Sequence, residues 1–537
     1  MDAEPRDDVL PLDAERTMSG VSGGAPGSAP PFVSILFRDS GRTPPAADPR
    51  VLTDLNLDQV ISALSKGREE YDLVPLLSVP LGDLASIAYR QAVFRDLESE
   101  AVRAAVESFA AGMRSMRHAL GLAQKLRNEF QRARWHLEAV QEYGRAIPQL
   151  VQALGAAAPG SDGLRSLLLY LRAYGDSGPF RSLVSEAGRL RSELDEITYC
   201  VRVEGRRVTI SRYSGEPDYG SEIEATFRRF PQGTTPNRQF RRTAWEDMDP
   251  VEEEIQEQVA RVFAPTFASL RMFPDRHPDF ADPAVVRFDR EVELYLAYLE
   301  MVRRLRAGGL EFSYPEVSER SKQLDVRQAF DLALAEKLRN QRARVVVNDV
   351  VLDGPARIAV VSGPNNGGKT TFARMFGQLL YLARLGGPVP GSSARLFLTD
   401  RIFTHFERVE RTTEMRGKLM DELVRVRAIL RDATDRSAIV LNETFASATV
   451  HDALFLGRRV LEEVRSRDAL CVYVTFLDEL STLGPETVSV VSQVAPDDPE
   501  VRTFRVVRQP ADGRAYATTL ARKYGLTYDR VRSRVGR

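Results

Sequence analysis

The chain has 537 residues, 43% hydrophobic and 28% charged, which is the balance of a globular protein of about three or four domains. Lys and Arg total 74 and Asp and Glu total 75, so the net charge of -1 excludes a uniformly basic nucleic-acid-binding protein. Two cysteines are too few for a disulfide framework, and the acidic N-terminus argues against a signal peptide. The apolar runs are well below the ~20 residues that span a bilayer, which argues against a membrane partner. We expect a cytoplasmic protein.

The first part of the chain is predicted to be a tail followed by helices. Residues 1–31 are rich in Gly, Pro, Ala and Ser, which is typical of a disordered tail. Apolar residues then recur at helical spacing, with stripes from Val102 to Leu120 and from Leu137 to Leu154. Such stripes fit a helical bundle or long antiparallel helices that act as levers, and periodicity does not separate the two. We assign residues 32–196 to a helical core and lever.

A basic segment follows, in which the apolar period changes from that of a helix to that of a strand. Tyr199, Val201 and Val203 alternate with polar residues, and Gly205 marks the turn of a hairpin. The segment from Ile197 to Arg242 holds nine Arg against five acidic residues, with aromatic residues interleaved. It could be a solvated hairpin face or a surface for a phosphate backbone. We assign residues 197–245 to a clamp-like insertion. The candidate DNA-binding residues are Arg228, Arg229, Arg238, Arg241 and Arg242.

The remaining chain is predicted to contain returning helices and then an α/β domain. Residues 246–324 regain helical spacing, with one apolar face formed by Val292, Leu296, Leu299 and Val302, and Gly308 and Gly309 interrupt it. From residue 325 to residue 510, short β-branched runs alternate with helical stretches, the pattern of an α/β domain. Residues 511–537 have the pattern of a helix-turn-helix.

The strongest motif is a phosphate-binding loop. A predicted buried strand, Arg357 to Val361, runs directly into a G-x-x-x-x-G-K-T loop that an amphipathic helix follows. Glycines allow backbone N–H groups to approach phosphates, and the helix N-terminus adds partial positive charge. Lys369 would reach the β- and γ-phosphates of ATP, and the Thr370 hydroxyl would ligate Mg²⁺. The predicted nucleotide-binding residues are Gly363, Pro364, Asn365, Asn366, Gly367, Gly368, Lys369, Thr370 and Thr371.

The second element of such a site is an apolar strand that ends in acid, and residues 437–443 supply it. A carboxylate at its end normally holds Mg²⁺ in position, and a following Glu polarises the attacking water. Here the first position is Asn442, whose amide oxygen can accept from a Mg²⁺-bound water but adds no charge. Glu443 is the candidate general base. We therefore expect Glu443 and Lys369 to be catalytic, and Thr370 and Asn442 to hold the metal.

These motifs resemble the MutS family of DNA mismatch-repair ATPases over about residues 345–535. The resemblance rests on the loop, on Asp400-Arg401-Ile402-Phe403-Thr404, and on the segments 442–449 and 474–480. It implies an ABC-like ATPase domain, so the expected fold class is α + α/β: a helical core and lever with a small clamp, followed by a P-loop ATPase. It also implies a homodimer, in which Arg416 or Lys418 of one subunit contacts the other subunit's nucleotide and residues 511–537 form a dimerisation element.

The departures from the family pattern bear on function. The family's acid before the catalytic Glu is Asn442 here, and its switch histidine is Phe476. Both changes leave the predicted ATP binding unaffected, but they imply slow hydrolysis. We also expect no mismatch-reading domain, no connector domain and no C-terminal nuclease-like extension. The predicted function is an ATP-driven homodimeric clamp that selects DNA by structure rather than sequence, in repair or recombination. The alternatives are an ATP-gated ribosome or RNA binder and a non-hydrolysing, ATP-locked scaffold.

Overall fold

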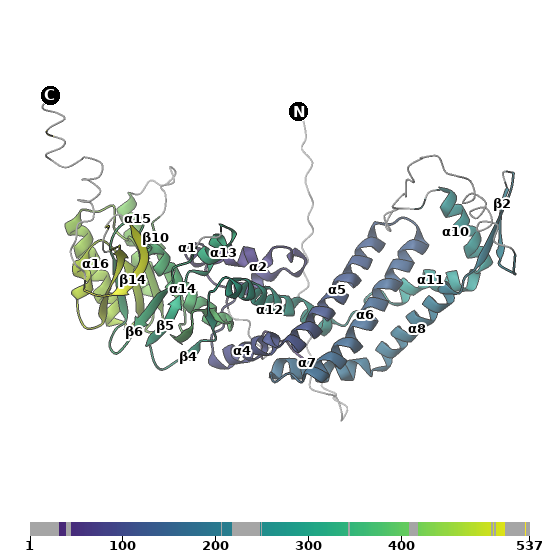
Figure 1. Ribbon diagram of the computed structural model, residues 1–537, viewed down its shortest axis with the longest axis horizontal. Helices are drawn as coiled ribbons and strands as arrows, with labels where there is room; N and C mark the ends of the chain where they lie inside the picture. The colour runs from purple at the N-terminus through teal and green to yellow at the C-terminus, as the bar shows by residue number, and fades with distance from the viewer. Residues whose placement is uncertain are drawn as a thin grey trace.

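The computed structural model describes residues 32–38, 45–205, 207–216, 248, 250–341, 344–407, 417–495, 498, 501–510 and 532. The molecule is elongated, with sheets at one end and long helices reaching toward the other (Figure 1). The tail predicted over residues 1–31 lies outside the described ranges, as does nearly all of the segment 511–537. Within those ranges, no helix has the length and apolarity needed to cross a bilayer.

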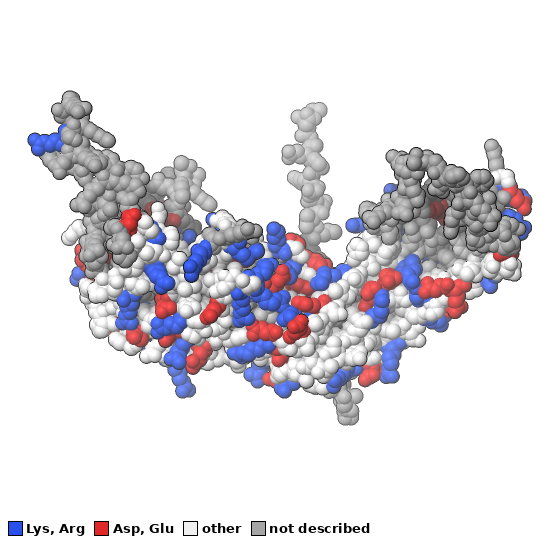
Figure 2. Space-filling model, viewed as in Figure 1, with Lys and Arg blue, Asp and Glu red and all other residues white. Residues whose placement is uncertain are grey.

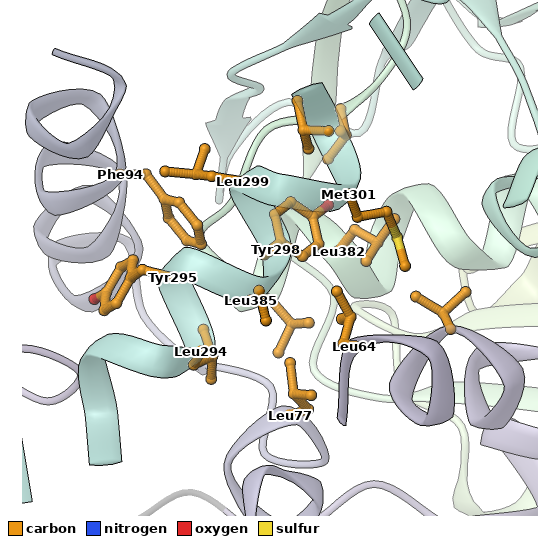
Figure 3. Close-up of a cluster of buried hydrophobic side chains, with 14 of the residues drawn as sticks. Leu64, Leu77, Phe94, Leu294, Tyr295, Tyr298, Leu299, Met301, Leu382 and Leu385 are labelled. Atoms are coloured by element: carbon orange, nitrogen blue, oxygen red, sulfur yellow. The ribbon is translucent and has the colours of Figure 1, made fainter. Parts of the chain in front are cut away.

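A helical core lies between the sheets and the long helices. It consists of α1 (Pro49–Asp54), α2 (Leu57–Ser65), η1 (Glu69–Tyr71), α3 (Leu73–Leu77), α4 (Leu84–Glu98) and α12 (Pro283–Ala307). Side chains from α2, α3, α4 and α14 surround α12 (Figure 3). Consecutive residues from Val292 to Leu299 of α12 are therefore buried, where the sequence had predicted a single apolar face.

The long helices carry the stripes that the sequence predicts. They are α5 (Glu100–Lys125), α6 (Glu129–Ala157), α7 (Asp162–Gly175), α8 (Gly178–Asp195), α10 (Pro250–Val262) and α11 (Ala264–Arg276). Val102 to Met116 on α5 and Leu137 to Leu154 on α6 supply the buried positions. At 1.5 Å per residue, the 29 residues of α6 extend for roughly 40 Å. These helices extend away from the core in Figure 1, and their action as levers stays a prediction.

The predicted hairpin is present at the end of the long helices that lies farthest from the sheets (Figure 1). Strands β1 (Tyr199–Glu204) and β2 (Arg207–Arg212) pair antiparallel, with Val201 opposite Ile210. Gly205 makes the turn at a φ of 63°, a value that glycine adopts without strain. The Arg212 guanidinium lies 4.9 Å from the Phe263 ring centroid at the start of α11. The candidate DNA-binding arginines lie beyond Glu216, outside the described residues.

The α/β part contains a six-stranded sheet in the order β10-β11-β12-β7-β13-β14. The first five strands are parallel and β14 is antiparallel to β13. Alternate residues of β7 face opposite sides: Ala359 and Val361 lie in the cluster that holds α14, and Ile358 and Val360 in the cluster that holds α15 and α16. The bounds are β7 (Ile358–Ser362), α14 (Lys369–Leu385), β10 (Ile402–Phe406), α15 (Lys418–Asp432), β11 (Ala438–Asn442), α16 (Val450–Ser466), β12 (Leu470–Val474), η2 (Asp478–Thr482), β13 (Thr487–Val494) and β14 (Arg502–Arg508).

A second sheet, in the order β4-β9-β5-β6, and the β3–β8 pair adjoin the large sheet. Their bounds are β3 (Phe312–Ser313), β4 (Glu316–Ser318), β5 (Leu324–Ala329), α13 (Leu332–Gln341), β6 (Asn348–Leu352), β8 (Val389–Pro390) and β9 (Ser393–Phe397). Strands β3 and β4 precede residue 325 yet pair with β8 and β9. This pairing favours a start for the α/β part near residue 312, earlier than we expected.

Candidate functional site: a phosphate loop at the sheet edge

The topology gathers the predicted site at one edge of the large sheet. The loop leaves the carboxyl end of β7, and Asn442 and Glu443 leave the carboxyl end of β11. Strand β12 lies between them and ends before Thr475 and Phe476. Because parallel strands end at the same edge, residues that are more than 100 positions apart in sequence share one site.

The loop backbone adopts conformations that its residue types allow. Gly363 and Gly368 have φ values of 116° and 96°, and Asn366 has a φ of 58°. Glycine reaches these values freely, and asparagine tolerates the left-handed region better than most residues. Gly367 is also required by space, because a Cβ there would lie 2.3 Å from Ser492 Oγ. The helix α14 begins at Lys369, so its N-terminal N–H groups face the loop.

Lys369 is held inside the loop by oxygen atoms. Its side-chain ammonium donates to Gly363 O at 3.0 Å, Pro364 O at 3.1 Å and Asn365 Oδ1 at 3.4 Å. The ammonium also lies 5.1 Å from the Phe476 ring centroid. Burial lowers the Lys369 pKa; the charge of Glu443 opposes this shift. A partly desolvated cation among loop carbonyls is suited to pairing with phosphate oxygens.

The residues predicted to hold the metal and to act as the base lie at the end of β11. Asn442 is 6% exposed, and no described residue bonds to its Oδ1 atom. A buried amide oxygen without a partner, with the Thr370 hydroxyl at the start of α14, is a donor set of the kind that Mg²⁺ prefers. Glu443 has a φ of 54°, and its N–H donates to Val474 O at 3.0 Å. That bond ties the Glu443 backbone to the end of β12, and its side chain is half-buried.

The position that the family gives to a histidine holds Phe476, which is 53% exposed. Its ring can interact with the Lys369 cation through its π face but offers no hydrogen bond to a phosphate. The candidate γ-phosphate contacts are not placed: Arg416 lies outside the described residues, as does the Lys418 side chain. Gly417 caps the N-terminus of α15.

Sequence reasoning missed two residues that touch the loop. Ser492 Oγ donates to Gly367 O at 2.5 Å, and Arg502 Nε donates to Asn365 O at 3.1 Å. Ser492 sits in an apolar strand, and Arg502 is one of three arginines on β14. Neither residue belongs to a motif with defined spacing, so only the pairing of β13 with β7 and β14 reveals the contact.

Comparison with known proteins agrees with this geometry. Residues 359–531 match the family model described as MutS domain V. The chain is 32% identical over 180 residues to the DNA mismatch repair protein MutS of Erythrobacter litoralis, and 35% identical over 160 residues to that of Zymomonas mobilis. It is 29% identical over 238 residues to the MutS of Syntrophomonas wolfei.

These matches cover 33%, 30% and 43% of this chain, and only 20%, 18% and 27% of the three relatives. They show that the C-terminal part of the chain is similar to part of these MutS proteins, and they support the predicted resemblance over the region in which the motifs lie. MutS domain V is the ATPase domain of that family.

Proposed function

We propose that this chain, which carries a MutS domain V over residues 359–531, is a DNA-binding ATPase that acts as an ATP-driven clamp. The observation that carries the proposal is the placement of three groups at one sheet edge: the Lys369 ammonium, the Asn442 amide oxygen, which has no partner among the described residues, and the Glu443 carboxylate. The finer parts of the proposal are that the protein acts as a clamp and that it forms a homodimer.

The residues of the site have separate roles in the proposed reaction. Loop N–H groups and the α14 N-terminus bind the phosphates, and Lys369 pairs with their charge. Thr370 and Asn442 would hold Mg²⁺, which when bound stabilises negative charge on the phosphate oxygens. Glu443 orients a water and accepts its proton as the water attacks the γ-phosphate. Asn442 adds no charge, so we expect slow turnover.

Contacts of α14 support the coupling of the nucleotide site to the long helices. Four side chains of this helix donate to backbone carbonyls of the α1–α4 segment. These bonds are Arg374 Nε to Asp54 O at 3.0 Å, Gln378 Nε2 to Leu55 O at 2.8 Å, Tyr381 OH to Leu77 O at 2.8 Å and Arg384 Nε to Leu81 O at 2.9 Å. Helix α4 leads directly into the lever α5. A shift of α14 on nucleotide binding would therefore move the base of the levers.

The proposed DNA contact is local rather than spread over the molecule. Acidic and basic side chains are interspersed over the described part of the face in Figure 2, without a broad basic field. The proposal places the contact on the arginine-rich segment that follows the β1–β2 hairpin, and places nucleotide contacts from the second subunit at Arg416 or Lys418. The segment 511–537 is the proposed dimerisation element.

We predict that replacing Arg238, Arg241 and Arg242 together with Ala weakens binding to all DNA sequences alike. Each contact between an arginine and a phosphate releases a counterion from the DNA. Losing three such contacts should therefore flatten the slope of log affinity against log salt by up to about three. Basal ATP turnover should stay unchanged. Salt titrations of DNA affinity measure the effect. An unchanged slope would assign the arginines to a solvated surface.

We also predict that ATP affinity falls as pH rises through the lowered pKa of Lys369. Phosphates favour the charged ammonium, so the complex keeps the proton that the free protein loses above that pKa. Binding must then take up a proton. Titration calorimetry in two buffers, at pH values from neutral up to the ordinary lysine pKa of about 10.4, measures affinity and proton uptake together. Constant affinity without proton uptake would show that the ammonium stays fully charged in the free protein.

A binding panel tests the proposed partner. Branched DNA, duplex DNA and structured RNA are compared with and without Mg²⁺-ATP, and we expect branched or duplex DNA to bind in an ATP-dependent manner. Preference for RNA would favour the ribosome-binding alternative.

A specific observation favours the scaffold alternative: Asn442 and Phe476 both replace groups that assist hydrolysis in the family. ATP-dependent dimers that show no turnover would support that reading.

A further inference from the structure

The outer side of the phosphate loop rests on the β13–β14 hairpin. Ser492 of β13 is fully buried, and its hydroxyl donates to Gly367 O at 2.5 Å. The contact is close on both sides: a Cβ on Gly363 would lie 2.9 Å from Ser492 O, and one on Gly367 would lie 2.3 Å from Ser492 Oγ. The loop backbone therefore packs directly on this serine.

Arg502 makes the second contact with the outside of the loop. Its Nε donates to Asn365 O at 3.1 Å, immediately before Asn366, which has a positive φ. The Arg502 charge also lowers the pKa of Lys369, so the guanidinium lies within electrostatic reach of the site. Arg502 thus holds the peptide at which the loop reverses direction.

An irregularity in β14 brings Arg502 to this position. The register between β13 and β14 shifts between Ser492, which pairs with Val506, and Val494, which pairs with Arg502. Phe504 lies in the shifted stretch with a φ of 58°, which is strained for an aromatic residue. Asn348 stabilises the irregular stretch, because its Nδ2 donates to Phe504 O at 3.1 Å and its Oδ1 accepts from Val506 N at 2.7 Å. Bulges of this kind redirect side chains beside active sites.

The carbonyl groups of the loop are therefore held from two sides. Lys369 holds Gly363 O and Pro364 O from the inside, and Ser492 and Arg502 hold Gly367 O and Asn365 O from the outside. In a phosphate loop the N–H groups must converge on the ligand. Fixing the carbonyls outward fixes the opposing N–H groups inward before the nucleotide arrives, which lowers the entropic cost of binding.

We infer that Ser492 and Arg502 are positioning residues that pre-organise the phosphate loop for the triphosphate. This inference rests on the proposed function. It goes beyond it by assigning nucleotide affinity to two side chains that belong to no nucleotide-binding motif. Neither residue needs to touch the nucleotide, because each acts through a loop carbonyl.

The test compares the Mg²⁺-ATP affinities of Ser492→Ala and Arg502→Ala with that of the parent chain. We expect each variant to bind roughly five- to twentyfold more weakly, the loss of one buried or charged hydrogen bond. Turnover at saturating ATP should change less than twofold, because Glu443 is untouched. Ser489→Ala is the matched control for the serine: it lies on the same strand, and its hydroxyl has no partner among the described residues. Arg505→Ala, an exposed arginine of β14, is the control for charge.

The outcomes separate the possible explanations. Parent-like affinity of both variants overturns the inference while leaving the proposed function intact, whereas failure of the parent chain to bind ATP contradicts the proposed function itself. If Arg502→Ala weakens binding and Ser492→Ala does not, long-range charge explains the effect and the inference is wrong. Melting temperatures without nucleotide identify a folding defect. In that case Arg502→Lys, which keeps a positively charged donor, should restore affinity if positioning is correct and leave it impaired if it is not.

Discussion

Lys369→Ala is expected to abolish measurable ATP binding, with an affinity at least about a hundredfold below that of the parent chain. The ammonium is the only cation seen to bond inside the loop among the described residues, and it would exchange loop carbonyls for the β- and γ-phosphates. Loss of hydrogen bonds between charged groups costs about 3 kcal/mol or more, and each 1.4 kcal/mol is tenfold. Equilibrium binding of a fluorescent ATP analogue measures the change.

Lys337→Ala is the matched control for this variant, because Lys337 is an exposed lysine of α13 outside the loop. It should bind ATP as the parent does. The folded state of Lys369→Ala should persist, since the alanine removes a buried charge and the loop carbonyls it satisfied can accept water. Unchanged ATP affinity and turnover in Lys369→Ala would show that this loop does not bind the phosphates of ATP.

Glu443→Gln should bind Mg²⁺-ATP like the parent and hydrolyse it roughly a hundred- to ten-thousandfold more slowly, the range for loss of a general base. The amide keeps the size of the side chain, and the backbone bond from Glu443 N to Val474 O does not depend on it. The ATP-bound state should therefore accumulate as a closed dimer. Single-turnover hydrolysis and size-exclusion chromatography with ATP measure the two effects.

Glu479→Gln is the matched control, because Glu479 is exposed and follows β12 near the same sheet edge. It should hydrolyse ATP at the parental rate. If the parent and Glu443→Gln hydrolyse ATP equally slowly, Glu443 has no catalytic role. The scaffold interpretation, in which ATP only locks a dimer, would then be favoured.

Periodicity and local motifs predicted much of the fold. The stripes of α5 and α6 are buried as the spacing indicates, and the strand, loop and helix around Lys369 occur in the expected order. These features depend on residues close together in sequence. The single apolar face predicted for the helix around Val292 was incomplete, because α12 is enclosed by several other helices. Enclosure from all sides is a property of the tertiary structure and leaves no period in the sequence.

The residues of the site also include some that the sequence predicted and some that it could not. Motif spacing identified Lys369, Asn442 and Glu443, and parallel strand order brings them together. Ser492 and Arg502 could not be found, because their contacts with Gly367 and Asn365 depend on a register shift more than 100 residues away. The DNA-binding arginines and the contacts of Arg416 and Lys418 remain predictions.

The central claim is that nucleotide binding at the Lys369 loop controls DNA binding. Its most direct test is the dissociation constant of the parent chain for a branched DNA, measured with Mg²⁺ and either a non-hydrolysable ATP analogue or no nucleotide. We predict that the analogue changes this constant by roughly fivefold or more, the usual scale of coupling between two sites. Binding of the analogue must be confirmed in the same samples. An identical DNA dissociation constant with the analogue bound would contradict the account.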